Sequence, residues 1–281
     1  MKIRKLVIPV AGMGTRFLPV TKSLPKEMLP LVDVPTIEVL LEEAKNAGIE
    51  EVIFVTSERK KVILKHFEKD AELENKLEKD GKIKLLEKVR NIDKKIKISS
   101  VLQDKPLGSG HAILQAKELV GNEAFAVMYG DDLIKGGCAL KELIEVYEKY
   151  DANVIGVQEV PYELTYKYGI VSLSNKDTLK INGLVEKPKV NPPSNLAGLG
   201  RYILKPEIFE VLENLSTGVN GEYQLTDAMA ILMEKEDFYA CKFTGTYYDI
   251  GSQLGYVKAN IMYALDRENL REDLLEFMKN I

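Results

Sequence analysis

The stretch PVAGMGTRFLPVTKSLPKEMLP, residues 9–30, decides the fold of this chain. It overlaps the end of a short apolar run, Leu6 to Val10, that predicts a first β-strand. Two glycines then predict a tight turn, which brings backbone N–H groups close to an anion. Arg16 and Lys26 add fixed positive charge a short distance along the chain. The stretch therefore predicts a site for a nucleoside triphosphate.

The segments after this stretch predict a parallel sheet. Residues 37–47 carry apolar side chains at helical spacing, and Glu51 to Thr56 has the pattern of a buried strand. A strand, a turn, a helix and a second strand in this order form a unit of a parallel α/β sheet. A later apolar run, Phe125 to Tyr129, predicts another strand and leads to Asp131 and Asp132. These two acids stand where open α/β sheets place their ligands, at the carboxyl end of a strand.

Residues 58–97 differ from the rest of the chain in charge. They hold 14 Lys or Arg and 9 Asp or Glu, so the segment is net positive while the remainder is net negative. Leu73 with Leu77 and Leu86 with Val89 have the spacing of amphipathic helices. We interpret the segment as a solvated helical excursion, with a basic docking patch as the alternative.

Composition argues against several classes of protein. No apolar run approaches the ~18 residues that span a bilayer, which predicts no membrane segment. The net charge of −4 argues against nucleic acid as a partner. Two cysteines, Cys138 and Cys241, suggest neither a disulfide framework nor a zinc site, and they fit a reducing cytoplasm. With only two histidines, the chemistry must rest on Asp, Glu, Lys and Arg.

The glycine turn is not one of the common nucleotide motifs. Phe17 stands where a dinucleotide fingerprint has its third glycine, which disfavours an NAD-dependent dehydrogenase, and no Gly-Lys-Ser/Thr closes a Walker A loop. Two glycines after a strand can also be a tight turn and nothing more. Arg16 favours a phosphate site, because a guanidinium binds two phosphate oxygens at once. Lys26, between Pro25 and Pro30, is a candidate for the same ligand, although most lysines are solvated surface groups.

Two more groups of charged residues follow predicted strands. Asp131 and Asp249 are the metal candidates, because Mg²⁺ takes few carboxylates and completes its octahedron with waters and phosphates. The alternative for each is a turn aspartate, which is favoured for Asp249 taken alone. Glu186 and Lys187 close a strand, where a carboxylate can accept sugar hydroxyls and an ammonium can hold a sugar phosphate. On its own, such a pair is also common at protein surfaces.

Together these motifs resemble those of the sugar nucleotidylyltransferase family. G-x-G-T-R, P-K-x-x-L-P, a P-L-G-S turn, G-D after a strand, E-K-P and a late Y-D-x-G occur in family order from residue 9 to about residue 255. KEMLP, the charged segment 58–97, GEYQLTDA at 221–228 and YDIGS are most similar to the bacterial members that use UTP and glucose 1-phosphate.

The resemblance implies a fold and a division of the chain. The expected fold is α/β, a Rossmann-like three-layer sandwich with a mixed, mostly parallel sheet. A single domain spans residues 1–281. Within it, residues 1–160 mainly bind the nucleotide and contain the insertion 58–97. Residues 161–251 mainly bind the sugar phosphate, and residues 252–281 form C-terminal helices.

The resemblance also implies roles for individual residues. The expected catalytic residues are Arg16, Lys26, Asp131 and Lys187. The expected Mg²⁺ ligands are Asp131 and Asp249, and no role follows for the adjacent Asp132. The expected nucleotide-binding residues are Ala11, Gly12, Gly14, Arg16, Lys26, Gln103 and Gly108. The expected sugar-phosphate-binding residues are Gly169, Glu186, Lys187 and Gly200.

The implied reaction transfers a uridylyl group from UTP to glucose 1-phosphate and releases pyrophosphate, with Mg²⁺ as cofactor and a homodimer or homotetramer as the assembly. One alternative is a nucleotidylyltransferase for another base or sugar, such as a thymidylyltransferase, because spacing alone does not resolve base choice. Another is a non-catalytic nucleotide or sugar-phosphate sensor on the same scaffold. The charged site residues are all present, which argues against the sensor, since a sensor should have lost one of them.

Overall fold

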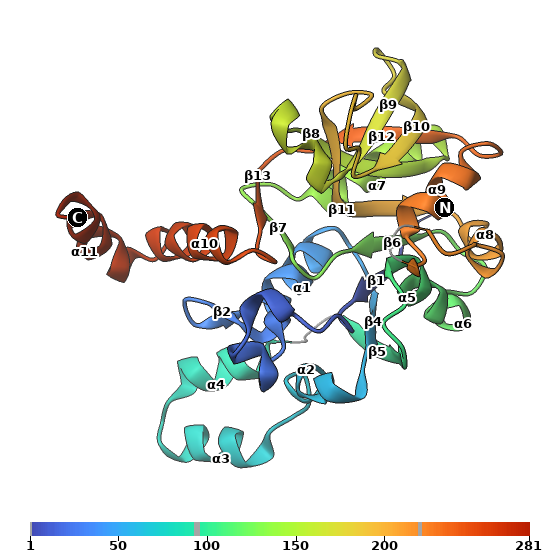
Figure 1. Cartoon of the computed structure of the whole chain (residues 1–281). Coiled ribbons are helices and arrows are strands. Elements are labelled where there is room, and N and C mark those ends of the chain that lie inside the picture. The colour runs from blue at the N-terminus through green and yellow to red at the C-terminus, as the bar shows by residue number, and fades with distance from the viewer. Residues whose placement is uncertain (1, 93–95, 219–220) are drawn as a thin grey trace.

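The computed structural model describes residues 2–92, 96–218 and 221–281. In this part of the chain, the strands form one large sheet and two small ones. The large sheet has nine strands in the order β5-β4-β1-β6-β11-β8-β12-β10-β9 (Figure 1). The strands are β1 (Lys5–Pro9), β2 (Pro30–Leu31), β3 (Val34–Pro35), β4 (Glu51–Thr56), β5 (Lys97–Leu102), β6 (Phe125–Met128), β7 (Asp132–Lys135), β8 (Asn153–Glu159), β9 (Gly169–Asn175), β10 (Lys180–Glu186), β11 (Leu196–Leu204), β12 (Phe238–Lys242) and β13 (Thr246–Asp249).

The helices follow the strands closely in the amino-terminal half and close the chain at its end. None of the described helices is both long and apolar enough to reach across a bilayer. The α-helices are α1 (Thr36–Asn46), α2 (Lys61–Lys65), α3 (Ala71–Lys79), α4 (Ile83–Arg90), α5 (Ser109–Gln115), α6 (Lys117–Val120), α7 (Ala139–Tyr150), α8 (Ile208–Glu213), α9 (Leu225–Leu232), α10 (Gln253–Leu265) and α11 (Glu268–Lys279). Short 3-10 helices are η1 (Thr15–Phe17), η2 (Val20–Lys22), η3 (Lys26–Met28), η4 (Glu58–Lys60) and η5 (Tyr162–Lys167).

The large sheet is mixed and mostly parallel, as the resemblance predicted. β5, β4, β1 and β6 are parallel neighbours, and β8 and β12 form another parallel pair. Among the described strands of this sheet, β11 and β10 run against the others. Because β1 and β6 are parallel neighbours, their carboxyl ends meet at one edge of the sheet. The glycine turn after β1 and the acids after β6 therefore emerge side by side, where ligands bind in α/β sheets.

Helices cover both faces of the sheet and make it the middle of three layers. On one face, Leu40 of α1 and Leu143 of α7 are fully buried in a single apolar cluster. On the other face, Ile113 of α5 and Met229 of α9 belong to a second cluster. Since both faces are covered, a central strand such as β4 is buried continuously and does not alternate between apolar and polar positions.

A buried arginine ties three elements to the turn that carries the acids. Arg201 in β11 is fully buried, and its Nη2 donates to Glu43 Oε2 of α1 at 2.8 Å. The same nitrogen donates to the backbone oxygen of Asp132 at 2.8 Å. Glu43 Oε1 also accepts from the backbone N–H of Leu140, in the first turn of α7, at 3.1 Å. The position of Asp132 is therefore fixed from the interior of the protein.

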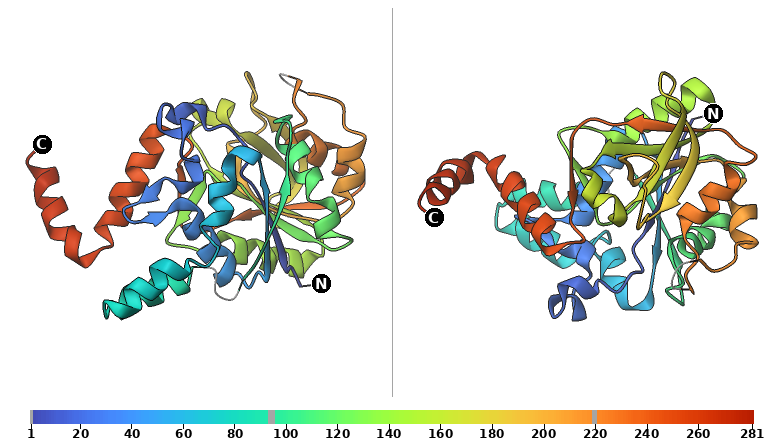
Figure 2. Two further views of the ribbon diagram at one scale, coloured as in Figure 1. Left: turned by 90° about the horizontal axis from the view of Figure 1, so that it is seen from below. Right: turned by 45° about the horizontal axis from the view of Figure 1, so that its top comes forward.

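A small antiparallel ribbon brings the end of the chain back to the site. β7 and β13 pair in a register that sets Asp249 opposite Asp132. After β13, α10 and α11 leave the body of the molecule and form an arm that projects in each view (Figures 1 and 2). No residue of α11 is buried within the described chain. The two predicted tail helices are thus confirmed, and the second one packs on little of its own chain.

The charged segment 58–97 forms the predicted amphipathic helices, α2 to α4, but one of its lysines is not solvated. Leu77 and Leu86 are buried between α3 and α4, whereas residues 93–95 lie outside the described part of the chain. Lys60 is only 6% exposed. It was expected on a solvated surface, and that expectation is wrong because Glu27, a residue outside the segment, binds its ammonium group in the interior.

Candidate active site

Two cavities lie next to each other at the edge of the sheet where β1 and β6 end. The larger has a volume of about 590 Å³ and the smaller about 380 Å³. Ser109, Tyr129 and Asp131 line both cavities. Asp131 therefore stands on the wall between them, and a group bound in one cavity can approach a group bound in the other.

The smaller cavity collects most of the residues that were predicted to bind the nucleotide. Gly14 lines neither cavity; its carbonyl accepts a hydrogen bond from the Thr21 hydroxyl at 2.8 Å, which supports the turn from behind. The predicted residues that line the smaller cavity are Ala11, Gly12, Lys26, Gln103 and Gly108.

The Gln103 amide is held in one orientation at the wall of the smaller cavity. Its Nε2 donates to the backbone oxygen of Gly108 at 3.3 Å and lies 2.9 Å from His111 Nδ1. Burial lowers the pKa of His111, which favours a neutral ring that can accept this bond. The amide oxygen of Gln103 remains to accept a hydrogen bond from a ligand.

Gly108 must be glycine because another backbone segment passes against it. Its φ is +110°, and a Cβ atom there would lie 2.5 Å from the backbone oxygen of Tyr223. Tyr223 donates its N–H to the Leu107 oxygen at 2.8 Å, and its own oxygen accepts from the Gly110 N–H at 2.8 Å. The segment GEYQLTDA thus packs on the second glycine turn and delivers Gln224 and Thr226 to the larger cavity.

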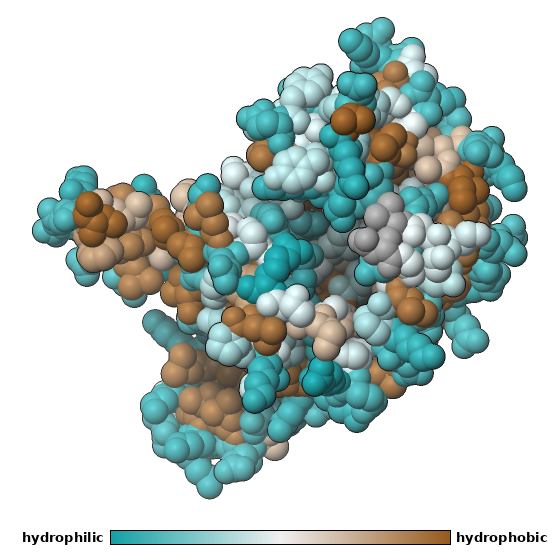
Figure 3. All heavy atoms as spheres, viewed as in Figure 1, coloured by the Kyte–Doolittle hydropathy of each residue, from teal (hydrophilic) through white to brown (hydrophobic). Residues whose placement is uncertain are grey.

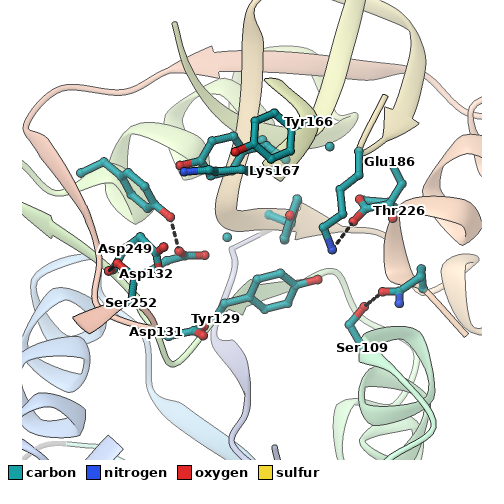
Figure 4. Close-up of a pocket in the computed structure, with 18 of the residues that line it drawn as sticks. Ser109, Tyr129, Asp131, Asp132, Tyr166, Lys167, Glu186, Thr226, Asp249 and Ser252 are labelled. Atoms are coloured by element: carbon teal, nitrogen blue, oxygen red, sulfur yellow. Dashed lines mark hydrogen bonds and ion pairs between the residues drawn. The ribbon is translucent and has the colours of Figure 1, made fainter. Parts of the chain in front are cut away.

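The larger cavity collects the residues that were predicted to bind the sugar phosphate and the metal. Figure 4 shows Asp131, Asp132 and Asp249 at one end, with Glu186 and Thr226 at the other. The predicted residues that line this cavity are Asp131, Gly169, Glu186, Lys187, Gly200 and Asp249. Arg16, which was predicted to bind the nucleotide, also lines this cavity and not the smaller one. Arg16 and Asp249, which are 233 positions apart in the sequence, therefore share one surface.

Lys187 is held at the end of β10 in an unusual backbone conformation. Its φ is +45°, in the left-handed region that residues with a Cβ rarely adopt. Its Nζ lies 3.1 Å from Glu186 Oε1, and its side chain is otherwise exposed to the cavity. Backbone strain of this kind collects at functional sites, where the surrounding structure maintains it. The geometry suits an ammonium group that meets an anionic ligand.

Two carboxylates converge on one small space and fit a magnesium ion. A Cβ atom at Gly251 would lie 2.6 Å from Asp131 Oδ2 and 3.1 Å from Asp249 Oδ1, so only glycine leaves this space open. Within residues 2–92, 96–218 and 221–281, no three His, Cys, Asp or Glu side chains form a metal cage. Mg²⁺ does not need one, because it retains waters and binds substrate phosphates through its remaining positions.

Lys26 and Asp131 form a close ion pair between the two cavities. The Nζ–Oδ2 distance is 2.5 Å. Burial by itself lowers the pKa of Lys26, but the charges of Asp131 and Glu27 outweigh it and raise the pKa above its ordinary value. Burial raises the pKa of Asp131, whereas Lys26 and Arg16 lower it further than burial raises it. At neutral pH the site therefore holds an ammonium and a carboxylate.

Asp132 does not share the environment of Asp131. Its Oδ1 accepts a hydrogen bond from the Tyr247 hydroxyl at 2.6 Å. Burial among protein groups, together with the negative charge of Asp131, raises the pKa of Asp132 to about 7. One of its oxygens is thus engaged by protein, and the carboxyl group is partly protonated near neutral pH.

Several residues of the larger cavity were not predicted from the sequence. Tyr129, Tyr168, Tyr202 and Tyr247 line it, and burial raises the pKa of each phenol, so all four remain neutral donors. Tyr202 lies in an apolar strand and Tyr129 directly follows one, so both have the pattern of core residues. Tyr168 and Tyr247 have no local signal that distinguishes them from structural tyrosines. For Gln224 and Thr226 a signal existed, because both lie in the GEYQLTDA motif.

The raised pKa of Asp132 predicts how stability changes with pH. The folded protein retains this proton up to about pH 7 while the unfolded chain releases it near its ordinary value, so the contribution is present at low pH and lost as pH rises through 7. Asp132→Asn should therefore gain stability over the wild type between pH 5 and pH 8, by about 1–3 kcal/mol. Urea unfolding in EDTA measures it, with the exposed Asp177→Asn as control. A difference that is constant with pH contradicts the prediction.

Comparisons with known proteins identify the family. The model of the family described as nucleotidyl transferase matches residues 5–265. The UTP–glucose-1-phosphate uridylyltransferases of Staphylococcus epidermidis and Bacillus subtilis are 48% and 45% identical over 284 residues, covering 100% of this chain and 99% and 97% of theirs. A UTP-bound UGPase from Acinetobacter baumannii superposes with a TM-score of 0.92 at 41% identity, covering 99% of each chain. A UDP-glucose pyrophosphorylase complexed with UDP-glucose gives 0.85 at 40%, covering 94% of this chain and 100% of the other. The chain belongs to the nucleotidyl transferase family.

Proposed function

We propose that this chain is a cytoplasmic enzyme that transfers a uridylyl group from UTP to glucose 1-phosphate, giving UDP-glucose and pyrophosphate. The observation that carries the proposal is the position of Asp131 on the wall shared by two cavities. Lys26 lines the smaller cavity, where it can bind a triphosphate, and Lys187 lines the larger one, where it can bind a sugar phosphate. The names of the relatives, which cover the full length of the chain, support the same substrates.

The chemistry of the transfer fits this charge arrangement. A phosphate oxygen of glucose 1-phosphate attacks the α-phosphorus of UTP, and the bond from that phosphorus to the β-phosphate oxygen breaks. Pyrophosphate leaves with the electron pair of the broken bond. Two anions must meet, so positioning and cationic stabilisation supply most of the catalysis. No covalent intermediate on the protein is required.

Each group of residues has a distinct task in the proposed reaction. Gln103 and Gly108 hold the base, and the turn at Ala11 and Gly12 lies along the nucleotide. Lys26 and Arg16 bind the triphosphate and the departing pyrophosphate. At the other end, Lys187 binds the phosphate of the acceptor, while Gly169, Glu186 and Gly200 surround the sugar. The carboxylate of Glu186 accepts hydrogen bonds from the hydroxyl groups of the sugar.

Asp131 and Asp249 would hold the Mg²⁺ ion. When bound, the ion would neutralise charge on the phosphates of both substrates. Lys26 keeps Asp131 ionised, because its ammonium group lowers the pKa of that carboxyl. Asp131 is therefore already in the state that a divalent cation needs.

The proposed reaction predicts a specific pattern of pyrophosphate release. A matrix of nucleoside triphosphates and sugar 1-phosphates should give release above background with UTP and glucose 1-phosphate. Removal of Mg²⁺ with EDTA should abolish it, because the side-chain cations alone do not offset the repulsion between two phosphate anions. A higher rate with another nucleotide or sugar would replace the proposed substrates, and no release with any pair would favour a binding protein.

Arg16→Ala tests the proposed role of the first turn. Turnover should fall by about two to three orders of magnitude, as expected when one positioned stabiliser of developing charge is lost. The melting temperature should stay close to the wild-type value, because Arg16 is exposed and exposed side chains contribute little to stability. Arg4→Ala is the matched control, since Arg4 pairs with Glu123 at the surface, away from both cavities. Near-normal turnover in Arg16→Ala would remove it from the mechanism.

We also propose that two or four copies of this chain associate through the C-terminal arm. Apolar side chains gather along α10 and α11 (Figure 3), and Phe277 is 61% exposed. Burying such a face against a second copy is favourable by roughly 25 cal/mol per Å² of apolar surface. Light scattering should give a mass of two or four times 31.6 kDa, and Phe277→Glu should lower it. A wild-type mass of one chain contradicts this expectation.

A further inference from the structure

A buried ion pair lies beside the smaller cavity, which one of its partners, Glu27, lines. Lys60 Nζ binds both carboxylate oxygens of Glu27, at 3.0 and 2.8 Å. Glu27 is 1% exposed and Lys60 is 6% exposed. Lys60 belongs to η4, at the start of the charged segment, and Glu27 to η3. The pair therefore joins the charged segment to the motif P-K-E-M-L-P.

Burial alone does not explain why these two residues are charged. Removing each ion from water costs several kcal/mol, and a well-packed apolar pair of similar volume is often as stable or more stable. Each ion nevertheless has a partner, because Lys60 Nζ contacts both carboxylate oxygens of Glu27. A functional reason for the charges has to come from their neighbours.

The neighbour that matters is Lys26, which precedes Glu27 in the same short helix. The ammonium group of Lys26 binds Asp131 Oδ2 on the wall between the two cavities. Glu27 is a second carboxylate near that ammonium group, because it is the next residue in η3 and both residues line the smaller cavity. Its charge also raises the pKa of Lys26. Glu27 and Asp131 can therefore both bind the ammonium group of Lys26, and Lys60 occupies both carboxylate oxygens of Glu27.

We propose that Lys60 is a positioning residue: it holds the carboxylate of Glu27 and so leaves the ammonium group of Lys26 to Asp131 and to the phosphates of the nucleotide. The inference rests on the proposed function for the role of Lys26. Four charges then alternate in sign in the order Lys60, Glu27, Lys26 and Asp131, from the charged segment to the wall between the cavities. Without Lys60, the unpaired carboxylate would draw Lys26 away from the site.

Two single variants separate this role from a structural one. Lys60→Met leaves an unpaired carboxylate beside Lys26, whereas Glu27→Gln breaks the same pair but leaves no charge that can capture Lys26. We expect Lys60→Met to lower kcat/KM for UTP by about 100-fold, the cost of misplacing a catalytic group by an ångström. The KM for glucose 1-phosphate should change little. Glu27→Gln should stay within about threefold of the wild type. Equal losses in both variants would overturn the proposal.

A double variant distinguishes displacement of Lys26 from loss of folded protein. Each single variant leaves one buried unpaired charge, Glu27 in Lys60→Met and Lys60 in Glu27→Gln, and can lower the population of folded protein. The double variant removes both charges, so activity per folded molecule should return toward the wild-type value, as it should in Lys60→Arg, which keeps the ion pair. Circular dichroism gives the folded fraction. Lys61→Met is the control, because Lys61 pairs with Glu58 at the surface and should behave as the wild type.

Crystal structures give a readout that does not depend on the reaction. In Lys60→Met, Lys26 Nζ should bind Glu27 instead of Asp131, and in Glu27→Gln it should remain on Asp131. If Lys26 stays on Asp131 in Lys60→Met, the inference is overturned whatever the activity. If the wild type releases no pyrophosphate from UTP and glucose 1-phosphate, the proposed function fails, while the partner of Lys26 in these structures still decides the role of Lys60.

Discussion

The bond network of Arg201 is the constraint on which the site depends. One buried guanidinium holds Glu43 of α1 and the backbone oxygen of Asp132, and Glu43 in turn holds the start of α7. Removing one partner of such a buried pair leaves an uncompensated charge, which typically costs about 3–5 kcal/mol. The network therefore cannot open without loss of local structure. It fixes the turn that carries Asp131 at the boundary between the two cavities.

The rest of the site depends on this turn through an ion pair, a hydrogen bond and a glycine that leaves space between two carboxylates. Lys26 of η3 binds Asp131, and Tyr247 of β13 donates to Asp132. Gly251 leaves open the space on which Asp131 and Asp249 converge. Each of these partners comes from a different part of the chain, but all of them meet at the carboxyl edge of the sheet. The parallel order of β1 and β6 is what makes that meeting possible.

The parts of this arrangement that could be predicted from the sequence are those with a local signature. β4 was predicted at 51–56 and has these bounds, because a strand buried on both faces is a continuous apolar run. The glycine turns and the acids after β6 were also predicted, because each has a local signature in the sequence. Gly251 stands in the quoted motif Y-D-x-G but received no role, and Tyr247 was not predicted. What makes each important is a neighbour more than a hundred residues away in the sequence.

Lys60 shows the limit of local patterns most clearly. In a segment with 14 Lys or Arg, each lysine has the same sequence context, and solvation is the reasonable expectation for all of them. The structure separates one from the others by giving it Glu27 as a partner inside the protein. Since a lysine is rarely buried unless a carboxylate pairs with it, the partner decides its burial. Here the partner lies within P-K-x-x-L-P, at a position that the motif leaves open. The charged segment therefore contributes to the electrostatics of the nucleotide cavity, and the motifs alone do not delimit the site.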